Sequence, residues 1–125
     1  MQKKNARKLG FTLVEIMIVV AIIGLLAAIA IPNFVKARTT SQMNACINNL
    51  RLIDSSKQQW ALEQRKQNTD TPAGSDLQPY LGRGTLGELP ACPVDSANAF
   101  SSSYTPNNVG TKPLCQIVSS THILP

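Results

Sequence analysis

Apolar residues form one long block near the start of the chain. After a polar and basic decapeptide, the run from Phe11 to Ile31 holds a single charged residue, Glu15. Its 21 residues would extend about 31 Å as an α-helix, close to the thickness of the hydrocarbon core of a bilayer. The block therefore predicts one membrane-spanning helix at residues 11–32.

A different pattern follows Pro32. From residue 33 to about residue 66, apolar side chains recur at steps of three and four, the period of one helix face. The positions on this face are Met43, Cys46, Leu50, Ile53 and Trp60, with Lys57 interrupting the series. We expect an amphipathic helix, continuous with the first across a bend at Pro32, because proline cannot donate the helical hydrogen bond. Trp60 is predicted to lie in the core that covers this face rather than to stack on a ligand.

Residues 67–125 are expected to form a small globular region. Turn-forming residues cluster at 68–75 and end the helical pattern. Ser75 and Gln78 then match a capping box, which predicts a short helix that ends near Gly82.

Strand candidates occur only toward the C-terminus. Phe100, Ser102 and Tyr104 alternate with other serines, residues 114–118 give a second candidate, and turn formers lie between the two segments. Two strands alone in water would be marginal, so the hairpin is expected to pack on the amphipathic helix. The predicted fold class is therefore α+β, a long N-terminal helix packed by a small C-terminal antiparallel β-sheet. The expected segments are a leader at residues 1–10, the spanning helix at 11–32, the amphipathic helix at 33–66 and the globular region at 67–125.

Basic residues are concentrated at the N-terminus. Four of the twelve, Lys3, Lys4, Arg7 and Lys8, lie in the first ten positions, which contain no acid. Without that decapeptide the chain carries eight basic and seven acidic residues, a near balance that argues against nucleic acid as a partner. Because Lys and Arg beside a span tend to remain cytoplasmic, we expect the N-terminus inside and the C-terminus outside the inner membrane.

Glu15 is an unusual residue for a membrane span. An acidic side chain at the centre of such a helix costs about 2.5 to 3.5 kcal/mol, so it needs a partner or a function. If the chain were cut after Gly10, Phe11 would carry a free ammonium four residues before Glu15. The two charges could then neutralise each other.

The segment from Lys8 to Glu15, followed by the apolar run and Pro32, resembles the prepilin signal shared by type IV pilins and the pseudopilins of type II secretion. The resemblance implies that a prepilin peptidase cleaves between Gly10 and Phe11 and methylates the Phe11 amine. It also implies that Glu15 guides assembly and that the helix is kinked at Pro32. The implied product is a homo-oligomeric filament, extracellular or periplasmic, built by an inner-membrane assembly platform from subunits first held in membrane lipid.

Three functions fit this signal to different degrees. We expect a pilin rather than a pseudopilin, because the C-terminal region lacks the Trp-Gly loop pattern of a typical major pseudopilin. A further alternative is a secreted, disulfide-stapled binding domain with an ordinary signal peptide, for which Ala28-Ile29-Ala30 imitates a cleavage site. The apolar run exceeds the usual length of about 7 to 15 residues, and Glu15 has no purpose in such a signal.

The three cysteines indicate an oxidising location. Cys92 and Cys115 flank the predicted hairpin, and a disulfide between them would contribute about 3 kcal/mol of stability. We rank this pair first because both lie in the same non-helical segment. Cys46 is then a buried thiol, and its pairing with either of the others remains an alternative.

Patterns for catalysis or metal binding are few. The one histidine, His122, has no nucleophile or carboxylate nearby in sequence and is expected on the surface or in terminal packing. Together with the cysteines it lacks the C-x2-C spacing typical of zinc sites. Asp95 and Asn98 could bind calcium, but residues 92–104 hold one carboxylate, and calcium takes about six to eight oxygen ligands. We expect a protein that is not an enzyme and has no cofactor, with calcium as the less favoured alternative.

Overall fold

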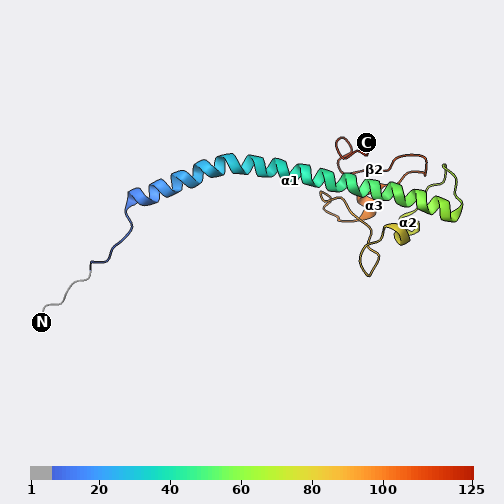
Figure 1. Cartoon of the computed structure of the whole chain (residues 1–125), viewed down its shortest axis with the longest axis horizontal. Coiled ribbons are helices and arrows are strands. Elements are labelled where there is room, and N and C mark those ends of the chain that lie inside the picture. The colour runs from blue at the N-terminus through green and yellow to red at the C-terminus, as the bar shows by residue number, and fades with distance from the viewer. Residues whose placement is uncertain (1–6) are drawn as a thin grey trace. The chain divides into compact units, whose positions relative to one another are not determined.

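The computed structural model describes residues 7–125, so the predicted leader at residues 1–10 lies partly outside the described residues. The chain divides into two compact units, Met1–Ala37 and Arg38–Pro125. In chain order the elements are α1 (Leu13–Gln64), α2 (Gly74–Leu81), α3 (Phe100–Ser103), β1 (Tyr104–Thr105) and β2 (Leu114–Cys115) (Figure 1). The predicted α+β class is confirmed.

The first part of α1 presents apolar side chains all around the helix. Every large apolar side chain from Phe11 to Ile31 is at least 49% exposed. Within residues 7–125, α1 is the one helix that is long and apolar enough to cross a membrane. Pro32 lies inside α1, so the predicted continuity is confirmed, whereas the bend stays a prediction. This apolar surface needs a bilayer or other chains to remove it from water.

The second part of α1 contributes one face to the core of the unit Arg38–Pro125. Of the predicted positions, Cys46, Leu50, Ile53 and Trp60 are buried and Met43 is half-buried, which confirms the amphipathic helix and the place of Trp60 in the core. The other buried apolar residues of this core are Leu77, Leu81, Cys92, Tyr104, Val109, Cys115 and Leu124.

The short helix α2 begins earlier than predicted. The cap is Ala73, whose amide donates a hydrogen bond to the carboxylate of Asp76 at 2.9 Å. The predicted capping box of Ser75 and Gln78 is therefore wrong, because the charged Asp76 side chain satisfies the amide at the start of the helix. The predicted end at Gly82 is confirmed.

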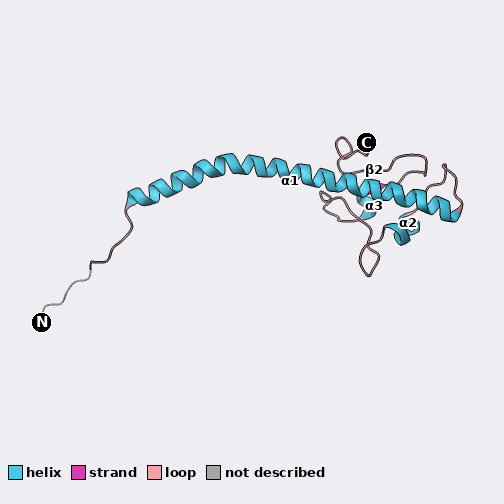
Figure 2. Cartoon of the chain, in the orientation of Figure 1, coloured by secondary structure: helices cyan, strands magenta, loops and turns pink. Residues whose placement is uncertain are grey.

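The sheet is smaller than predicted. β1 and β2 pair antiparallel, with Tyr104 opposite Cys115 and Thr105 opposite Leu114, so the hairpin is confirmed. β2 ends at Cys115 rather than continuing to residue 118. Figure 2 shows that helix and loop make up most of the described chain, and loops provide much of the cover for α1.

Helix α3 stands where the first strand was predicted to begin. The hydroxyls of Ser102 and Ser103 donate hydrogen bonds to the carboxylate of Asp95 at 2.5 and 2.7 Å. The amide of Ser103 also donates to the carbonyl of Ala99 at 3.1 Å. These local bonds stabilise a helical turn, because serine side chains compete with strand pairing for hydrogen-bond partners. The prediction of a strand at residues 100–103 was wrong for this reason.

Lys57 was predicted to interrupt the buried face. The prediction is wrong, because Lys57 is fully buried within that face. Its Nζ donates to the carbonyl oxygens of Pro106 at 2.7 Å, Asn108 at 3.0 Å and Thr111 at 2.5 Å. The Asp54 carboxylate lies 3.8 Å away. Three carbonyls match the three hydrogens of an ammonium, which reduces the cost of burying the charge. Lys57 therefore holds the loop between β1 and β2 against α1.

Replacing Lys57 by methionine should lower the free energy of unfolding by about 2 to 3 kcal/mol, because the carbonyls of that loop lose their donor. The matched control is Arg51→Met at an exposed position of α1, which should cost about 0.5 kcal/mol or less. Urea unfolding of the full chain in detergent, followed by the fluorescence of the single tryptophan, measures both. Equal stabilities of the two variants would show that the buried ammonium does not hold the loop.

Candidate functional site

The predicted cleavage site lies in an irregular segment just before α1. Gly10 and Phe11 are both exposed. A Cβ placed on Gly10 would meet no atom within 4 Å, so the fold itself does not require glycine there. The peptide bond between these residues is accessible to an enzyme. If glycine is required at position 10, the requirement comes from the active site of that enzyme and not from the fold.

Glu15 has a local structural role beyond the one predicted for it. The amide of Thr12 donates to Glu15 Oε2 at 2.8 Å, and the amide of Glu15 donates to Thr12 Oγ1 at 3.2 Å. This reciprocal pair is a capping box that satisfies two amides at the start of α1. The Thr-x-x-Glu pattern in the sequence is the signal that could have predicted it.

The capping box leaves Glu15 able to bind a second partner. A carboxylate has two oxygens and about four acceptor positions, and the bond from Thr12 occupies one of them. The bond also comes from a neutral amide and so does not balance the negative charge. An ammonium placed beside Glu15 could do so without dismantling the cap.

The cysteines predicted to form a disulfide lie close together. The Sγ atoms of Cys92 and Cys115 are 3.9 Å apart, and Cys46, Cys92 and Cys115 are all free thiols in this structure. The Nδ1 atom of His122 lies 3.7 Å from Cys92 Sγ and 3.9 Å from Cys115 Sγ. His122 is buried, so of its two predicted places terminal packing is right and the surface is wrong. The disulfide stays a prediction. The three cysteines and His122 lie close together in the fold although the sequence lacks the C-x2-C spacing of zinc sites.

The residues weighed for calcium take part in a turn. The Asp95 carboxylate accepts hydrogen bonds from the hydroxyls of Ser102 and Ser103 and from the amide of Ala97. These bonds, with Ser102 the largest contribution, hold the pKa of Asp95 below its usual value. Asn98 follows with a φ of 48°, a left-handed conformation that asparagine tolerates. The carboxylate thus serves the turn that leads into α3.

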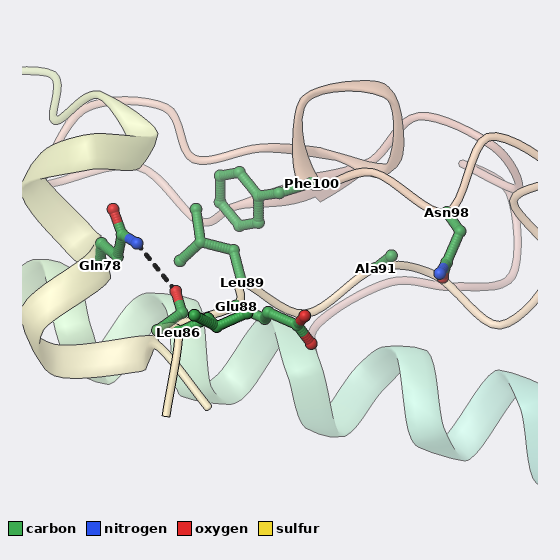
Figure 3. A pocket seen from close by; sticks show the side chains of 8 residues that line it. Gln78, Leu86, Glu88, Leu89, Ala91, Asn98 and Phe100 are labelled. Atoms are coloured by element: carbon green, nitrogen blue, oxygen red, sulfur yellow. Dashed lines mark hydrogen bonds between the residues drawn. The ribbon is translucent and has the colours of Figure 1, made fainter. Parts of the chain in front are cut away.

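A cavity of about 630 Å³ lies beside α2 and is lined by Gln78, Leu86, Gly87, Glu88, Leu89, Ala91, Asn98 and Phe100. Gln78 donates to the carbonyl of Gly87 at 3.0 Å on one side of it (Figure 3). Glu88 is the one ionisable residue among these lining residues. The lining therefore offers no pair of an acid and a base of the kind that proton-transfer catalysis uses.

Comparison with known proteins centres on the N-terminal segment. The prokaryotic N-terminal methylation motif matches residues 5–31. The type IV major pilin protein PilA of Myxococcus xanthus is 57% identical over 49 residues, which cover 39% of this chain and 22% of that protein. A fimbrial protein of Pseudomonas aeruginosa is 40% identical over 73 residues, 47% of its length. The chain thus spans less than half of these two relatives. No solved structure gives a significant match.

Two other relatives align over most of this chain. The type II secretion system core protein G of Dickeya chrysanthemi is 26% identical over 98 residues, 78% of this chain and 58% of that protein. The type IV major fimbrial protein FimA of Dichelobacter nodosus is 34% identical over 119 residues, 82% of this chain and 74% of that protein. With the methylation motif and the single long helix, this alignment shows that the chain belongs to the type IV pilin family.

Proposed function

We propose that the chain is a structural, non-catalytic subunit of a type IV pilus-like filament. The observation that carries the proposal is the apolar part of α1, whose large side chains are at least 49% exposed while residues 38–125 have a core of their own. A membrane covers this surface before assembly, and the same helix of neighbouring subunits covers it in the filament. The chain is thus an inner-membrane protein first and a filament component afterwards.

Proteolytic processing prepares the subunit for its transfer from the membrane to the filament. A prepilin peptidase cuts between Gly10 and Phe11 and methylates the new amine, which the match to the methylation motif across both residues supports. The Phe11 ammonium then meets Glu15 of a neighbouring subunit. This contact joins two different surfaces, as a polymer that grows in one direction requires. The basic leader stays in the cytoplasm, and residues 38–125 face outward.

The remaining segments follow from this arrangement. Residues 1–10 are the removed leader, residues 11–32 form the filament core, and residues 33–66 carry the globular region at 67–125. Pro32 is the point at which α1 bends or unwinds as the subunit leaves the membrane for the filament, because its ring lacks the amide that would bond one turn back. An inner-membrane assembly platform performs the transfer.

A pseudopilus of type II secretion is the second candidate, and the similarity to the Dickeya chrysanthemi protein favours it. The pilus ranks first because the Dichelobacter nodosus fimbrial protein has the higher sequence identity, 34% against 26%. The alignment also covers more of that protein, 74% against 58%. Deleting the gene separates the two. Loss of surface filaments with normal protein secretion supports a pilus, and loss of secretion with normal filaments supports a pseudopilus.

The intact mass of this chain in a sheared filament fraction tests the proposal. We expect one species that begins at Phe11 and carries one additional methyl group. A chain that begins just after Ala30, found free in the medium, would instead identify an ordinary signal peptide and a secreted domain. The same mass therefore decides between the filament subunit and the secreted binding domain.

A further inference from the structure

Four potential metal ligands from separate parts of the chain meet in the core of the unit Arg38–Pro125. Cys46 comes from α1, Cys92 from the loop before α3, Cys115 from β2 and His122 from the C-terminal segment. All four are buried, and their ligand atoms lie within 4.8 Å of one another. Packing of an apolar core requires no such convergence of three thiols and an imidazole.

Three of these four atoms are spaced as in a tetrahedral zinc site. With Zn–S bonds of about 2.3 Å and Zn–N bonds of about 2.0 to 2.1 Å, such a site places two sulfurs about 3.8 Å apart and a sulfur and a nitrogen about 3.6 Å apart. The two sulfurs of Cys92 and Cys115 are 3.9 Å apart, and His122 Nδ1 lies 3.7 and 3.9 Å from them. Cys46 Sγ lies within 4.8 Å of the other three ligand atoms and is the fourth potential ligand.

A chain of hydrogen bonds from surrounding residues ends at the sulfur of Cys46. Tyr104 donates its hydroxyl to Cys46 Sγ at 3.5 Å and accepts from the Asn49 amide group at 3.0 Å. The Asn49 side-chain oxygen in turn accepts from Arg83 at 3.2 Å. This chain of hydrogen bonds runs from the Arg83 guanidinium to the Cys46 sulfur, so a donor already faces that sulfur. Metal-bound ligands are commonly oriented by such outer hydrogen bonds.

The backbone of Cys92 is also fixed. Its amide donates to the Ser103 hydroxyl at 2.9 Å, and its carbonyl accepts from the Asp95 amide at 2.9 Å. Ser103 in turn donates its hydroxyl to the Asp95 carboxylate. The turn that leads into α3 therefore presents Cys92 to the cluster in one orientation.

From this geometry we propose that Cys46, Cys92, Cys115 and the Nδ1 atom of His122 bind one structural zinc ion. Zinc is favoured over calcium or magnesium because the donors are sulfur and nitrogen rather than oxygen. Four protein ligands close the coordination sphere and leave no position for substrate, so the role is structural. The ion joins α1, the loop before α3, the hairpin and the C-terminal segment. The proposal is independent of the filament role.

A disulfide between Cys92 and Cys115 is the competing state of the same residues. The disulfide would use the thiols of Cys92 and Cys115 and would give the buried Cys46 and His122 side chains no bonding role. The zinc ion uses all four groups, and for that reason the structure favours it. A sulfur in a disulfide cannot also serve as a thiolate ligand, so each chain holds either the disulfide or the zinc ion. Measurements on one sample can tell the two states apart.

Metal analysis of the mature full chain, purified in detergent without chelator, distinguishes the zinc site from the disulfide. We expect about one zinc per chain and, after denaturation in a chelator, three thiols that react with an alkylating reagent. A chain that is two hydrogens lighter, with one reactive thiol and no zinc, would establish the disulfide and overturn the proposal. Three reactive thiols without zinc, even after incubation with zinc salt, would overturn it as well.

Variants test the assignment of the ligands, with bound Co²⁺ as the spectroscopic probe. His122→Ala should weaken metal binding by more than about 100-fold, whereas His122→Cys should retain it with a spectrum shifted toward four sulfur ligands. Tyr104→Phe, which removes the donor to Cys46, should weaken binding by about 10-fold to 100-fold. Ser56→Ala, a buried change on the same helix, is the control for folding and should bind as the wild type does. Wild-type affinity in His122→Ala would contradict the site, and a loss in Ser56→Ala equal to that in His122→Ala would show that the loss reflects misfolding rather than a missing ligand.

Discussion

Glu15→Gln should remove most filament assembly while leaving the start of α1 capped. Glutamine can accept the hydrogen bond from the Thr12 amide that Glu15 accepts at 2.8 Å, so the capping box survives. The negative charge is lost, and the Phe11 ammonium of the neighbouring subunit is left without a counter-charge in an apolar setting. The ratio of sheared filament to membrane-held subunit should fall by about 10-fold or more, since an unpaired buried charge costs about 3 to 5 kcal/mol.

Two further variants separate the charge from the cap. Thr12→Ala removes the hydroxyl that accepts from the Glu15 amide at 3.2 Å but keeps the carboxylate, so filaments should form at nearly the wild-type yield. Glu15→Asp keeps the charge and shortens its reach, so its yield should be intermediate. If Thr12→Ala were as defective as Glu15→Gln, capping of the helix rather than pairing of charges would be the function of Glu15.

Gly10→Val should leave the chain as an uncleaved precursor in the membrane. The structure makes no steric demand at this position, because a Cβ on Gly10 meets no atom within 4 Å. A β-branched side chain beside the cleaved bond would instead obstruct the peptidase. We expect little or no mature chain by intact mass, and consequently no filaments.

The matched control for this prediction is Gly24→Val. A Cβ at Gly24, inside α1, also meets no atom within 4 Å, so the same substitution is made where the peptidase does not cut. This variant should be processed normally, whatever its effect on helix packing in the filament. Normal maturation of Gly10→Val would remove the basis for cleavage at this bond.

The long helix was predictable because its signals are local. The apolar block of residues 11–31 and the later spacing of apolar side chains at three and four positions each identify helix within a few turns. The same spacing placed Trp60 correctly in the core. Lys57 broke the pattern in the sequence because its partners are backbone carbonyls about fifty positions away, and no side-chain pattern marks them.

The C-terminal region was predicted less well because its structure depends on distant or competing hydrogen bonds. Ser102 and Ser103 alternate with aromatic residues as a strand would, but their bonds to Asp95 favour a helical turn. The cluster of cysteines with His122 could not be found by motif spacing, because its members come from four segments that only the fold brings together. The Thr12 and Glu15 capping box, by contrast, was readable from four consecutive residues.

In the proposed filament, the apolar part of α1 becomes the interior of a polymer of identical subunits. Image reconstruction of sheared filaments at a resolution that shows side chains tests it most directly. We expect a bundle of helices of residues 11–31 at the axis, each Phe11 amine beside Glu15 of a neighbour, with residues 38–125 on the outside. A reconstruction in which this chain is not the repeating subunit, or in which its apolar helix does not lie in the interior, would show that α1 does not form the core of a filament.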